Sequence, residues 1–417
     1  MRTDHTVLSL DPMYSPLHEK IAQLTSVKKY AVTSCVAKRI YLPSFRHFLA
    51  VGLIDSVTKE EAKPYQAKVA TMQTYHHAYA YKIEGRTLSN EELNYMARFY
   101  VALKSFITDK GVSLVLVHNE SRWYHSVAVT LCRELGIPYL VTEQGLIRPH
   151  TTVIDPQGCN ANSKIEFDSD SRSNLASESK LHIFNPTDKH DSIKSMFFFF
   201  IFLVIFTLER ANYSQTVLRY MHNNYSLRKY TRRIFNKVLR KRRRLFSSCE
   251  GAILLLLQLE NDSQFLLHSQ FYSNQQVIDL LSQLADENGC NLAVKCHPLD
   301  EKSYTLSEHA YIVDGEITEL SDMASVVFTI NSSASIDVLK TKTPLILLGE
   351  SIYNREGVAQ RYNPDEGLSL FNLANLDVSN SKRKLFLSYL RNQYLVRGAG
   401  YSFCSECLRY RLEQLLE

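Results

Sequence analysis

The stretch Gly251-Ala-Ile-Leu-Leu-Leu-Leu257, followed directly by Gln258-Leu-Glu-Asn-Asp262-Ser-Gln264, decides the fold class of this chain. A short, continuous apolar run bounded by polar residues is typical of a strand buried on both faces, as in a parallel sheet. Open α/β sheets bind their ligands beyond the carboxyl ends of such strands. The stretch therefore places carboxylate, amide and hydroxyl groups where this architecture does its chemistry.

Two further apolar runs in the C-terminal half also end in polar residues. The run Asn291-Leu-Ala-Val-Lys295 leads into Cys296-His297-Pro298, and the run 325–330 leads into Asn331-Ser332-Ser333. A helix is predicted near 274–288, because apolar residues recur there at helical spacing. The alternation of strand and helix predicts a parallel sheet with right-handed crossovers.

The N-terminal half repeats this alternation less regularly, and a chain of 417 residues is too long for one ordinary core. The last of its predicted strands runs into Glu143-Gln-Gly-Leu-Ile-Arg148-Pro149. The predicted fold class is α/β and GT-B-like, with two Rossmann-like domains whose parallel sheets face each other across a cleft. The alternation by itself leaves other tandems of doubly wound domains open. The strands predicted in this half are 6–10, 29–33, 112–117 and 138–142.

The predicted domain organisation has four parts. An N-terminal domain and a C-terminal domain are separated by an apolar and basic helical connector, and helices at the end of the chain return toward the N-terminal domain. A Ser- and Asp-rich stretch, 163–195, is predicted to be an exposed insertion. The four parts are 1–195, 196–249, 250–385 and 386–417.

Composition favours a globular cytoplasmic protein, with 45% hydrophobic and 22% charged residues. The eight cysteines are scattered, which favours reduced thiols. Cys404-Ser-Glu-Cys407 is a single pair of this spacing without a second pair, so a zinc site is not expected. The net charge of +5 is unevenly distributed, since 211–249 contains no acidic residue while Arg228–Arg244 is densely basic. We expect that segment to meet an anionic surface.

The apolar segment Met196–Leu208 raises the question of a membrane contact. A helix of this length spans roughly 20 Å, less than the ~30 Å of a bilayer core, so a buried or interfacial helix is expected. A membrane-docking element backed by the basic segment is one interpretation. An inter-domain helix with solvated basic neighbours is the other.

The polar strand ends form two predicted groups. Lys295, His297 and Asn331-Ser332-Ser333 can hold a phosphate, although helix capping and a structural histidine are the alternatives when each is taken singly. Asp262 and Glu143 lie at strand ends of different domains, so they can face each other across the cleft. Capping by Asp262 and an ion pair of Glu143 with Arg148 remain as alternatives.

Several familiar motifs are missing from the sequence. No G-x-G-x-x-G and no G-x-x-x-x-G-K-[ST] occurs, so the sequence does not favour dinucleotide or P-loop binding. No Asp-x-Asp follows a predicted strand. Neither a cofactor nor a metal is expected, and protein cations would hold a donor phosphate.

At these residues the sequence resembles the capsule polysaccharide biosynthesis family, bacterial transferases of β-linked Kdo, a keto-deoxy-octulosonic sugar acid. Three patches carry the resemblance. The first is Glu143–Pro149 with Gly158-Cys-Asn160 and Asn162-Ser163. The other two are Gln258–Gln264, and Lys295-Cys-His297-Pro298 with Asn331-Ser332-Ser333.

The resemblance implies a retaining enzyme that uses CMP-Kdo without a metal. Asp262 would attack the anomeric carbon, and Glu143 would act as acid and base. Gln258 and Arg148 would contact the sugar carboxylate or shape the pocket. The C-terminal domain would bind the donor and the N-terminal domain the acceptor. The residues implied at the CMP phosphate are Lys295, His297, Asn331, Ser332 and Ser333.

A chain with one transferase module resembles the family member that starts the poly-Kdo linker on a phosphatidylglycerol-type lipid. This implies a cytoplasmic protein that is peripheral on the inner face of the bacterial inner membrane, which it contacts through Phe197–Leu208 and Arg228–Arg244. The partners implied are capsule assembly or export components, and no nucleic acid. One departure is Asp11-Pro12-Met13-Tyr14-Ser15, where the family usually has a glycine-containing loop. Alternatives are another CMP-sugar transferase, such as a sialyltransferase, or a non-catalytic basic membrane- or nucleic-acid-binding protein.

Overall fold

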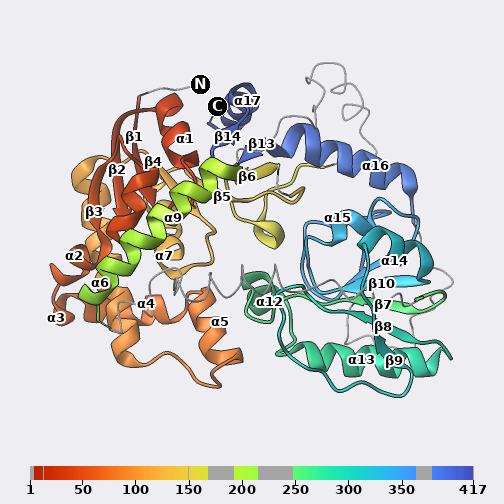
Figure 1. The fold of residues 1–417 in the computed structure, drawn as a ribbon. Helices are drawn as coiled ribbons and strands as arrows, with labels where there is room; N and C mark the ends of the chain where they lie inside the picture. The colour runs from red at the N-terminus through yellow and green to blue at the C-terminus, as the bar shows by residue number, and fades with distance from the viewer. Residues whose placement is uncertain are drawn as a thin grey trace.

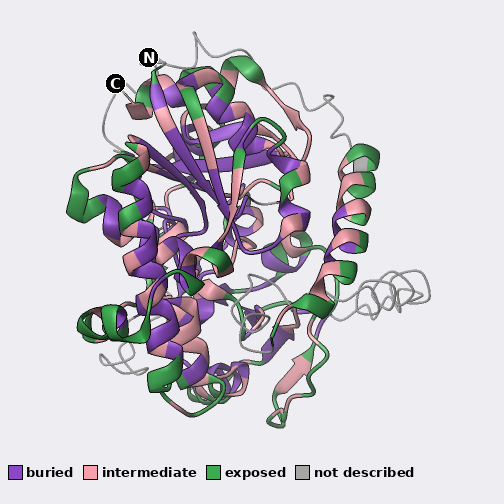
Figure 2. Cartoon of the chain, turned by 90° about the vertical axis from the view of Figure 1, so that its left-hand side faces the viewer, coloured by how far each residue is buried: buried purple, intermediate pink, exposed green. Residues whose placement is uncertain are grey.

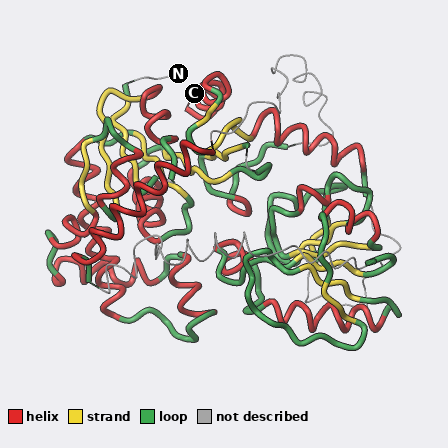
Figure 3. Tube along the Cα trace, viewed as in Figure 1, coloured by secondary structure: helices red, strands yellow, loops and turns green. Residues whose placement is uncertain are grey.

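Two separate β-sheets, each flanked by helices, organise the chain (Figure 1). The computed structural model describes residues 4–12, 14–148, 150–167, 192–214, 248–362 and 378–416. The basic segment Arg228–Arg244 and most of the predicted insertion lie outside the described residues. Figure 3 shows the strands of the two sheets as two groups in different parts of the molecule. The predicted fold class, two Rossmann-like α/β domains, is confirmed.

The N-terminal sheet has eight strands in the order β14-β13-β6-β5-β4-β1-β2-β3. The five strands from β5 to β3 in this order pair in parallel, whereas β6, β13 and β14 join antiparallel. The parallel part carries β4 and β5, whose carboxyl ends hold the polar residues predicted from the sequence. The bounds are β1 His5–Leu10, β2 Ser26–Thr33, β3 Arg46–Leu49, β4 Leu114–His118, β5 Tyr139–Gln144, β6 Thr151–Asp155, β13 Leu395–Ala399 and β14 Ser402–Phe403.

Helices cover both faces of this sheet. The longest, α6 (Asn90–Lys110), begins with a capping box formed by Ser89 and Glu92 and ends at Gly111, whose φ of 60° suits a glycine. The others are α1 Leu17–Thr25, η1 Val36–Tyr41, α2 Ala50–Asp55, α3 Lys59–Ala62, η2 Lys63–Tyr65, α4 Gln66–Ala70, α5 Tyr75–Lys82 and α7 Trp123–Leu135. Figure 2 shows the strands as the buried centre of the domain and the outer turns of the helices as its exposed surface.

The C-terminal sheet has six parallel strands in the order β12-β11-β10-β7-β8-β9. Its central strands β7 and β10 are buried along their whole length, as the continuous apolar runs predict. The strands are β7 Ile253–Leu256, β8 Leu292–Lys295, β9 Ala310–Ile312, β10 Val326–Thr329, β11 Leu345–Leu347 and β12 Gln360–Arg361. The helices are α12 Ser263–His268, α13 Asn274–Glu287, α14 Ile317–Met323, α15 Ser335–Val338 and α16 Asn380–Tyr389.

After α16 the chain returns to the N-terminal domain, and strands as well as a helix make this return. A π-helical turn, η9 (Leu390–Tyr394), leads into β13, which pairs with the free edge of β6. The last helix, α17 (Ser405–Leu416), packs near α1 (Figure 1). The sequence predicts only helices here, because five residues that include Arg397 and Gly398 do not show a strand pattern.

Two groups of contacts tie the domains together. Helix α5 of the N-terminal half packs against α12, and Lys82 Nζ donates to the carbonyls of Ser269 and Phe271. The short η3 helix (Asn160–Asn162) supplies the second group, where Asn160 Nδ2 donates to the carbonyl of Asn331 at 3.1 Å. The carboxyl ends of the two sheets are therefore held close together.

The apolar segment forms α9 (Ser192–Glu209), followed by the short η5 helix (Arg210–Asn212). Helix α9 lies across the N-terminal domain against η1 (Figure 1). Within the described residues, none of the helices combines the length and the apolar content that a membrane span requires.

Candidate functional site

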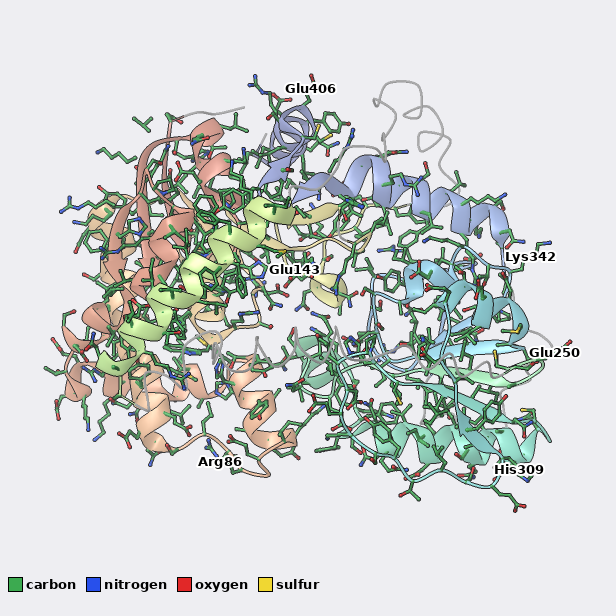
Figure 4. All side chains as sticks on the ribbon, in the orientation of Figure 1. Arg86, Glu143, Glu250, His309, Lys342 and Glu406 are labelled. Atoms are coloured by element: carbon green, nitrogen blue, oxygen red, sulfur yellow. The ribbon has the colours of Figure 1, made fainter. Side chains whose placement is uncertain are left out.

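Glu143 lies near the carboxyl end of β5, on the side of the N-terminal domain that faces the C-terminal domain (Figure 4). Its Oε2 accepts a hydrogen bond of 2.9 Å from Asn119 Nδ2, and its Oε1 accepts one of 2.8 Å from the backbone N–H of Gln144. His118 Nε2 lies 3.6 Å from Oε1. Among the described residues, the ion pair with Arg148 considered from the sequence does not form, so Glu143 is oriented by neutral donors.

Asn119 connects this carboxylate to the other domain. Its backbone has a φ of 59°, a left-handed conformation that asparagine tolerates better than most residues. Its Oδ1 accepts from the backbone N–H of Ser121 at 3.1 Å, which leaves Nδ2 free to donate to Glu143 and, at 3.4 Å, to the hydroxyl of Ser263. Ser263 directly follows Asp262, so one amide group spans the space between the two predicted catalytic carboxylates.

Asp262 caps α12, as the alternative interpretation of the sequence proposes. Its Oδ1 accepts from the backbone N–H of Gln264 at 2.8 Å, and Oδ2 has no hydrogen-bond partner among the described residues. The side chain keeps contact with solvent but lies in the cleft, where loss of surrounding water raises its pKa. The charge of Glu143 raises this pKa further, while Arg148 and His297 act in the opposite direction.

Four predicted site residues from the two domains interact electrostatically. Glu143 and Arg148 come from the N-terminal domain, whereas Asp262 and His297 come from the C-terminal domain. Asp262 lies within electrostatic range of the other three, but its side chain is exposed and lines neither of the two cavities described below, and Glu143 lines a different cavity from Arg148 and His297.

The cleft contains a cavity of about 280 Å³. Five of the nine predicted site residues line it, namely Arg148, Lys295, His297, Ser332 and Ser333. Apolar side chains of both domains form most of its other walls, together with the charged Asp337 and Lys340. The remaining lining residues are Leu146, Ile147, Leu256, Leu257, Cys296, Pro298, Ile317, Ala334, Ile336, Asp337 and Lys340.

His297 presents a hydrogen-bond donor in this cavity. Its Nδ1 accepts from the backbone N–H of Leu299 at 3.1 Å, so the neutral ring carries its proton on Nε2. Burial lowers the pKa of His297, which favours this neutral form, although the nearby Asp262 and Asp300 act in the opposite direction. Lys295 supplies a positive charge beside it, held by an ion pair of 3.2 Å with Asp314.

Ser332 and Ser333 contribute hydroxyl groups to the cavity, and only a short helix follows them. Helix α15 begins only at Ser335 and contains four residues, so it provides little helix dipole. The hydroxyl of Ser332 accepts from the backbone N–H of Ala334 at 3.2 Å and so caps the turn. Side-chain donors and the turn itself are what this segment can offer to an anion.

Gln258 and Asn331 form hydrogen bonds in the protein interior and do not line the cavity. Both are buried, and Gln258 Nε2 donates to Asn331 Oδ1 at 2.8 Å. Asn331 Nδ2 donates in turn to the carbonyl of Gln264, and the carbonyl of Asn331 accepts from Asn160 of the other domain. Their role in this structure is to fix the strand-end loops relative to each other, and direct binding by them stays a prediction.

A second cavity, of about 180 Å³, lies in the N-terminal domain, and Glu143 is one of its lining residues. Its walls come from the loop after β1, from the ends of β4 and β5, and from the returning C-terminal chain. Sequence analysis does not identify it, since its Ala399 and Gly400 are distant in sequence from its other residues. It is lined by Tyr14, Ser15, Leu17, His118, Thr142, Glu143, Gln144, Thr152, Ala399 and Gly400.

A buried ion pair supports the loop that leads to this second cavity. Asp11 Oδ2 lies 3.1 Å from Lys38 Nζ, and both side chains are almost fully buried. Burial alone would raise the pKa of Asp11, but the charge of Lys38 and the hydrogen bond from Ser34 outweigh it, so this pKa is lowered. The backbone of Asp11 has a φ of 30°, close to the conformation that glycine adopts readily.

In the described part of the chain, no group of three or more His, Cys, Asp or Glu side chains is arranged to hold a metal ion.

Comparisons with known proteins agree with the resemblance seen in the sequence. The profile of a family described as "Capsule polysaccharide biosynthesis protein" matches residues 113–401. The capsule polysaccharide export protein KpsS of Escherichia coli is 26% identical over 277 residues, which are 58% of this chain and 69% of that protein. The capsule polysaccharide modification protein LipB of Neisseria meningitidis serogroup B is 23% identical over 291 residues, 62% of this chain and 68% of that protein.

Among solved structures, the chain is similar to the beta Kdo 2,7 transferase of Thermosulfurimonas dismutans KpsC, with a TM-score of 0.40 and 13% identity, over 99% of this chain and 100% of that chain. The family predicted from the sequence motifs is confirmed by the profile match, which covers more than half of the chain. The chain belongs to the capsule polysaccharide biosynthesis protein family.

Proposed function

We propose that this protein is a retaining glycosyltransferase that moves β-linked Kdo from CMP-Kdo to a phosphatidylglycerol-type lipid, and so starts the poly-Kdo linker of a capsular polysaccharide. One observation carries the proposal: Asn119 Nδ2 donates to Glu143 at 2.9 Å and to the hydroxyl of Ser263 in the other domain at 3.4 Å, so Glu143 lies close to the residue that follows Asp262. Membership of a capsule polysaccharide biosynthesis family supports it. We further propose that the protein acts at the inner face of the bacterial inner membrane.

The 280 Å³ cavity suits the CMP end of the donor. Its cationic groups, Lys295 and Arg148, can balance the phosphate charge, and the Nε2–H of His297 can donate to a phosphate oxygen. The hydroxyls of Ser332 and Ser333 add neutral donors. Apolar walls from both domains, such as Ile147 and Ile336, exclude water and strengthen these interactions.

The free oxygen of Asp262 suits it for attack on the sugar. In the first step its carboxylate forms a bond to the anomeric carbon, the bond from that carbon to the phosphate oxygen breaks, and CMP leaves with the electron pair. The raised pKa makes Asp262 a stronger nucleophile than a solvated carboxylate. Lys295 and His297 stabilise the charge on the departing phosphate.

Glu143 suits the second step because it faces the second cavity. An acceptor hydroxyl attacks the same carbon, the bond to Asp262 breaks, and Glu143 takes the hydroxyl proton. Two displacements at one carbon return the original configuration, which is why the proposal is a retaining reaction. Asn119 and the backbone N–H of Gln144 orient the carboxylate of Glu143 for this transfer.

The test is incubation of the purified protein with CMP-Kdo and a lysophosphatidylglycerol acceptor, followed by mass spectrometry of the lipid. A lipid that gains one Kdo supports the proposal. Turnover with CMP-sialic acid alone would point to another CMP-sugar transferase. No turnover with either donor would leave the non-catalytic basic binding protein as the better interpretation.

A matched variant tests the role of Asp262. Asp262→Asn keeps a side-chain oxygen for the cap of α12 but removes the nucleophile. We expect it to fold normally and to lose transfer. A sugar-acid adduct on the wild-type peptide that contains Asp262, absent from the variant, would identify the covalent intermediate.

A further inference from the structure

The outer face of α9 exposes a continuous row of large apolar side chains. Six residues of this helix are between 38% and 81% exposed. Apart from the adjacent pair Met196 and Phe197, they follow one another at intervals of three or four residues, which places them on one side. Figure 2 shows exposed turns along the length of α9. We call this row the outer face, and it consists of Ile193, Met196, Phe197, Phe200, Val204 and Leu208. An exposed apolar row of this size is rare on a monomeric soluble domain and marks an interaction surface.

The inner face of the same helix is firmly attached to the N-terminal domain. Phe202 is almost fully buried and contacts the rings of Tyr14 and Tyr41, and Phe198 stacks on Tyr401 at 4.6 Å between ring centroids. At the end of the helix, the Glu209 carboxylate accepts hydrogen bonds from the backbone N–H groups of Val36 and Ala37. The outer face is thus exposed on a helix that is held in place.

The charge pattern of the chain indicates what covers this face. No charged residue lies between Met196 and Leu208, whereas 211–249 contains no Asp or Glu and is rich in Lys and Arg. Apolar side chains next to a cationic sequence are typical of helices that lie in the interface of an anionic bilayer. A second copy of this chain would bring two cationic sequences together, and their repulsion disfavours that occupant.

The contacts of α9 also connect the outer face to the second cavity. Tyr14 lines that cavity and meets Phe199 and Phe202 edge-on. Gly400, which also lines it, immediately precedes Tyr401, the stacking partner of Phe198. Tyr14 therefore lines the cavity and contacts the helix, and Gly400 of the cavity wall adjoins a second residue that contacts the helix.

We propose that the outer face of α9 binds to the surface of an anionic lipid bilayer and thereby holds the second cavity next to that surface. Assigning this cavity to the headgroup of a lipid acceptor rests on the proposed function. The binding of α9 to the bilayer does not depend on it, since it follows from exposed apolar side chains and neighbouring charge.

The test uses the full chain and vesicles made of equal parts phosphatidylglycerol and phosphatidylcholine. The variant Phe197→Ser/Phe200→Ser/Val204→Ser removes three apolar side chains from the outer face and leaves the inner face intact. We expect its partition coefficient onto these vesicles to fall at least about tenfold, because each buried side chain of this kind contributes roughly that factor or more. The matched control, Ile312→Ser/Met323→Ser/Tyr410→Ser, removes exposed apolar side chains elsewhere and should bind as the wild type does.

Two results would overturn the proposal. One is equal vesicle binding by the wild type and the α9 variant. The other is a wild-type dimer in sedimentation experiments that the α9 variant converts to a monomer, with vesicle binding unchanged. Turnover of CMP-Kdo with a short-chain, water-soluble acceptor separates this question from the proposed function. The α9 variant should retain that turnover. If the proposed function is wrong, the wild type will show no such turnover either.

Discussion

Asn119 Nδ2 donates a hydrogen bond of 2.9 Å to the carboxylate of Glu143. The same amide reaches Ser263 of the C-terminal domain. Orientation of Glu143 is therefore linked to the closeness of the two domains. In the proposed reaction this makes Asn119 a positioning residue, which acts through Glu143 and does not touch the substrate itself.

Asn119→Gly tests this role, because glycine adopts the left-handed backbone of this position without strain. The variant loses a hydrogen bond to a charged group, worth about 1.5–3 kcal/mol. We expect kcat of Kdo transfer to fall about 10- to 100-fold while KM for CMP-Kdo changes little. Steady-state kinetics with both substrates varied measures the two effects separately.

Ser263→Ala is the control for this experiment, since it removes only the contact between domains and keeps the bond to Glu143. It should lower kcat much less than Asn119→Gly does. Equal losses in the two variants would show that Asn119 matters for domain closure and not for Glu143. An unchanged kcat in Asn119→Gly would contradict the positioning role altogether.

Two variants of His297 separate the roles of its two ring nitrogens. In His297→Asn the amide oxygen can replace Nδ1 as acceptor for the backbone N–H of Leu299, but the Nε2–H donor is lost. In His297→Gln the longer amide can restore a donor near the Nε2 position. We expect the Kd of CMP to rise about 10-fold in the first variant, as the loss of one phosphate hydrogen bond implies, and less in the second.

Isothermal titration of each variant with CMP gives these constants without any need for turnover. A larger effect of the glutamine variant would indicate that His297 acts through the Leu299 contact and serves mainly to shape the loop. Unfolding curves of both variants show whether the loop itself has changed.

The pH dependence of transfer should report on Asp262. The nucleophile acts as a carboxylate, so the rate falls when the pH drops through its pKa, which the cleft raises above the usual range. Arg148 lowers this pKa, and Arg148→Gln should therefore move the acidic limb of kcat/KM to higher pH. Lys340 is a cation of the same cavity but is paired with Asp337. We therefore expect Lys340→Gln to leave the pH of the acidic limb unchanged.

A full kcat/KM profile between acidic and neutral pH for the wild type and both variants makes the comparison. A shift toward lower pH in Arg148→Gln, or an equal shift in Lys340→Gln, would contradict the assignment of this limb to Asp262.

Most of the C-terminal sheet could be predicted, because its strands are continuous apolar runs that end abruptly in polar residues. The predicted runs 251–257, 291–295 and 325–330 correspond to β7, β8 and β10. Their polar ends meet at one edge because parallel strands end together, which explains why Lys295, His297 and the serines share a cavity.

Other features depend on contacts that no local pattern reveals. The partners Asn119 and Ser263 are 144 residues apart, and Gly400 reaches the second cavity only because β13 pairs with β6. Gln258 and Asn331 carry the amide groups expected of ligand contacts, yet those groups bond to each other. Helix α6 is absent from the helices predicted from the sequence, although Ser89, Glu92 and Gly111 mark its two ends.

The ion pair of Asp11 with Lys38 gives a prediction about stability. Lys38→Met leaves the carboxylate of Asp11 buried without its counter-charge, and removal of one partner of such a pair typically costs about 3–5 kcal/mol. In Asp11→Gly, the glycine readily adopts the φ of 30° at this position, but Lys38 loses its counter-charge. The double variant Asp11→Gly/Lys38→Met has neither charge, so we expect it to be more stable than either single variant. Urea unfolding of all four proteins measures the coupling.

The pH dependence of this coupling has a definite sign. The pKa of Asp11 is lower in the folded protein than its ordinary value of 3.8, so the pair stabilises the folded state above that value. This stabilisation is lost as the pH falls through the folded-state pKa, because the carboxylate then becomes protonated. The stability difference between wild type and double variant should therefore be constant near neutral pH and change only below about pH 4. A difference that changes between pH 5 and 8 would instead assign the effect to the neighbouring buried histidines His18, His118 and His125, whose pKa values burial lowers.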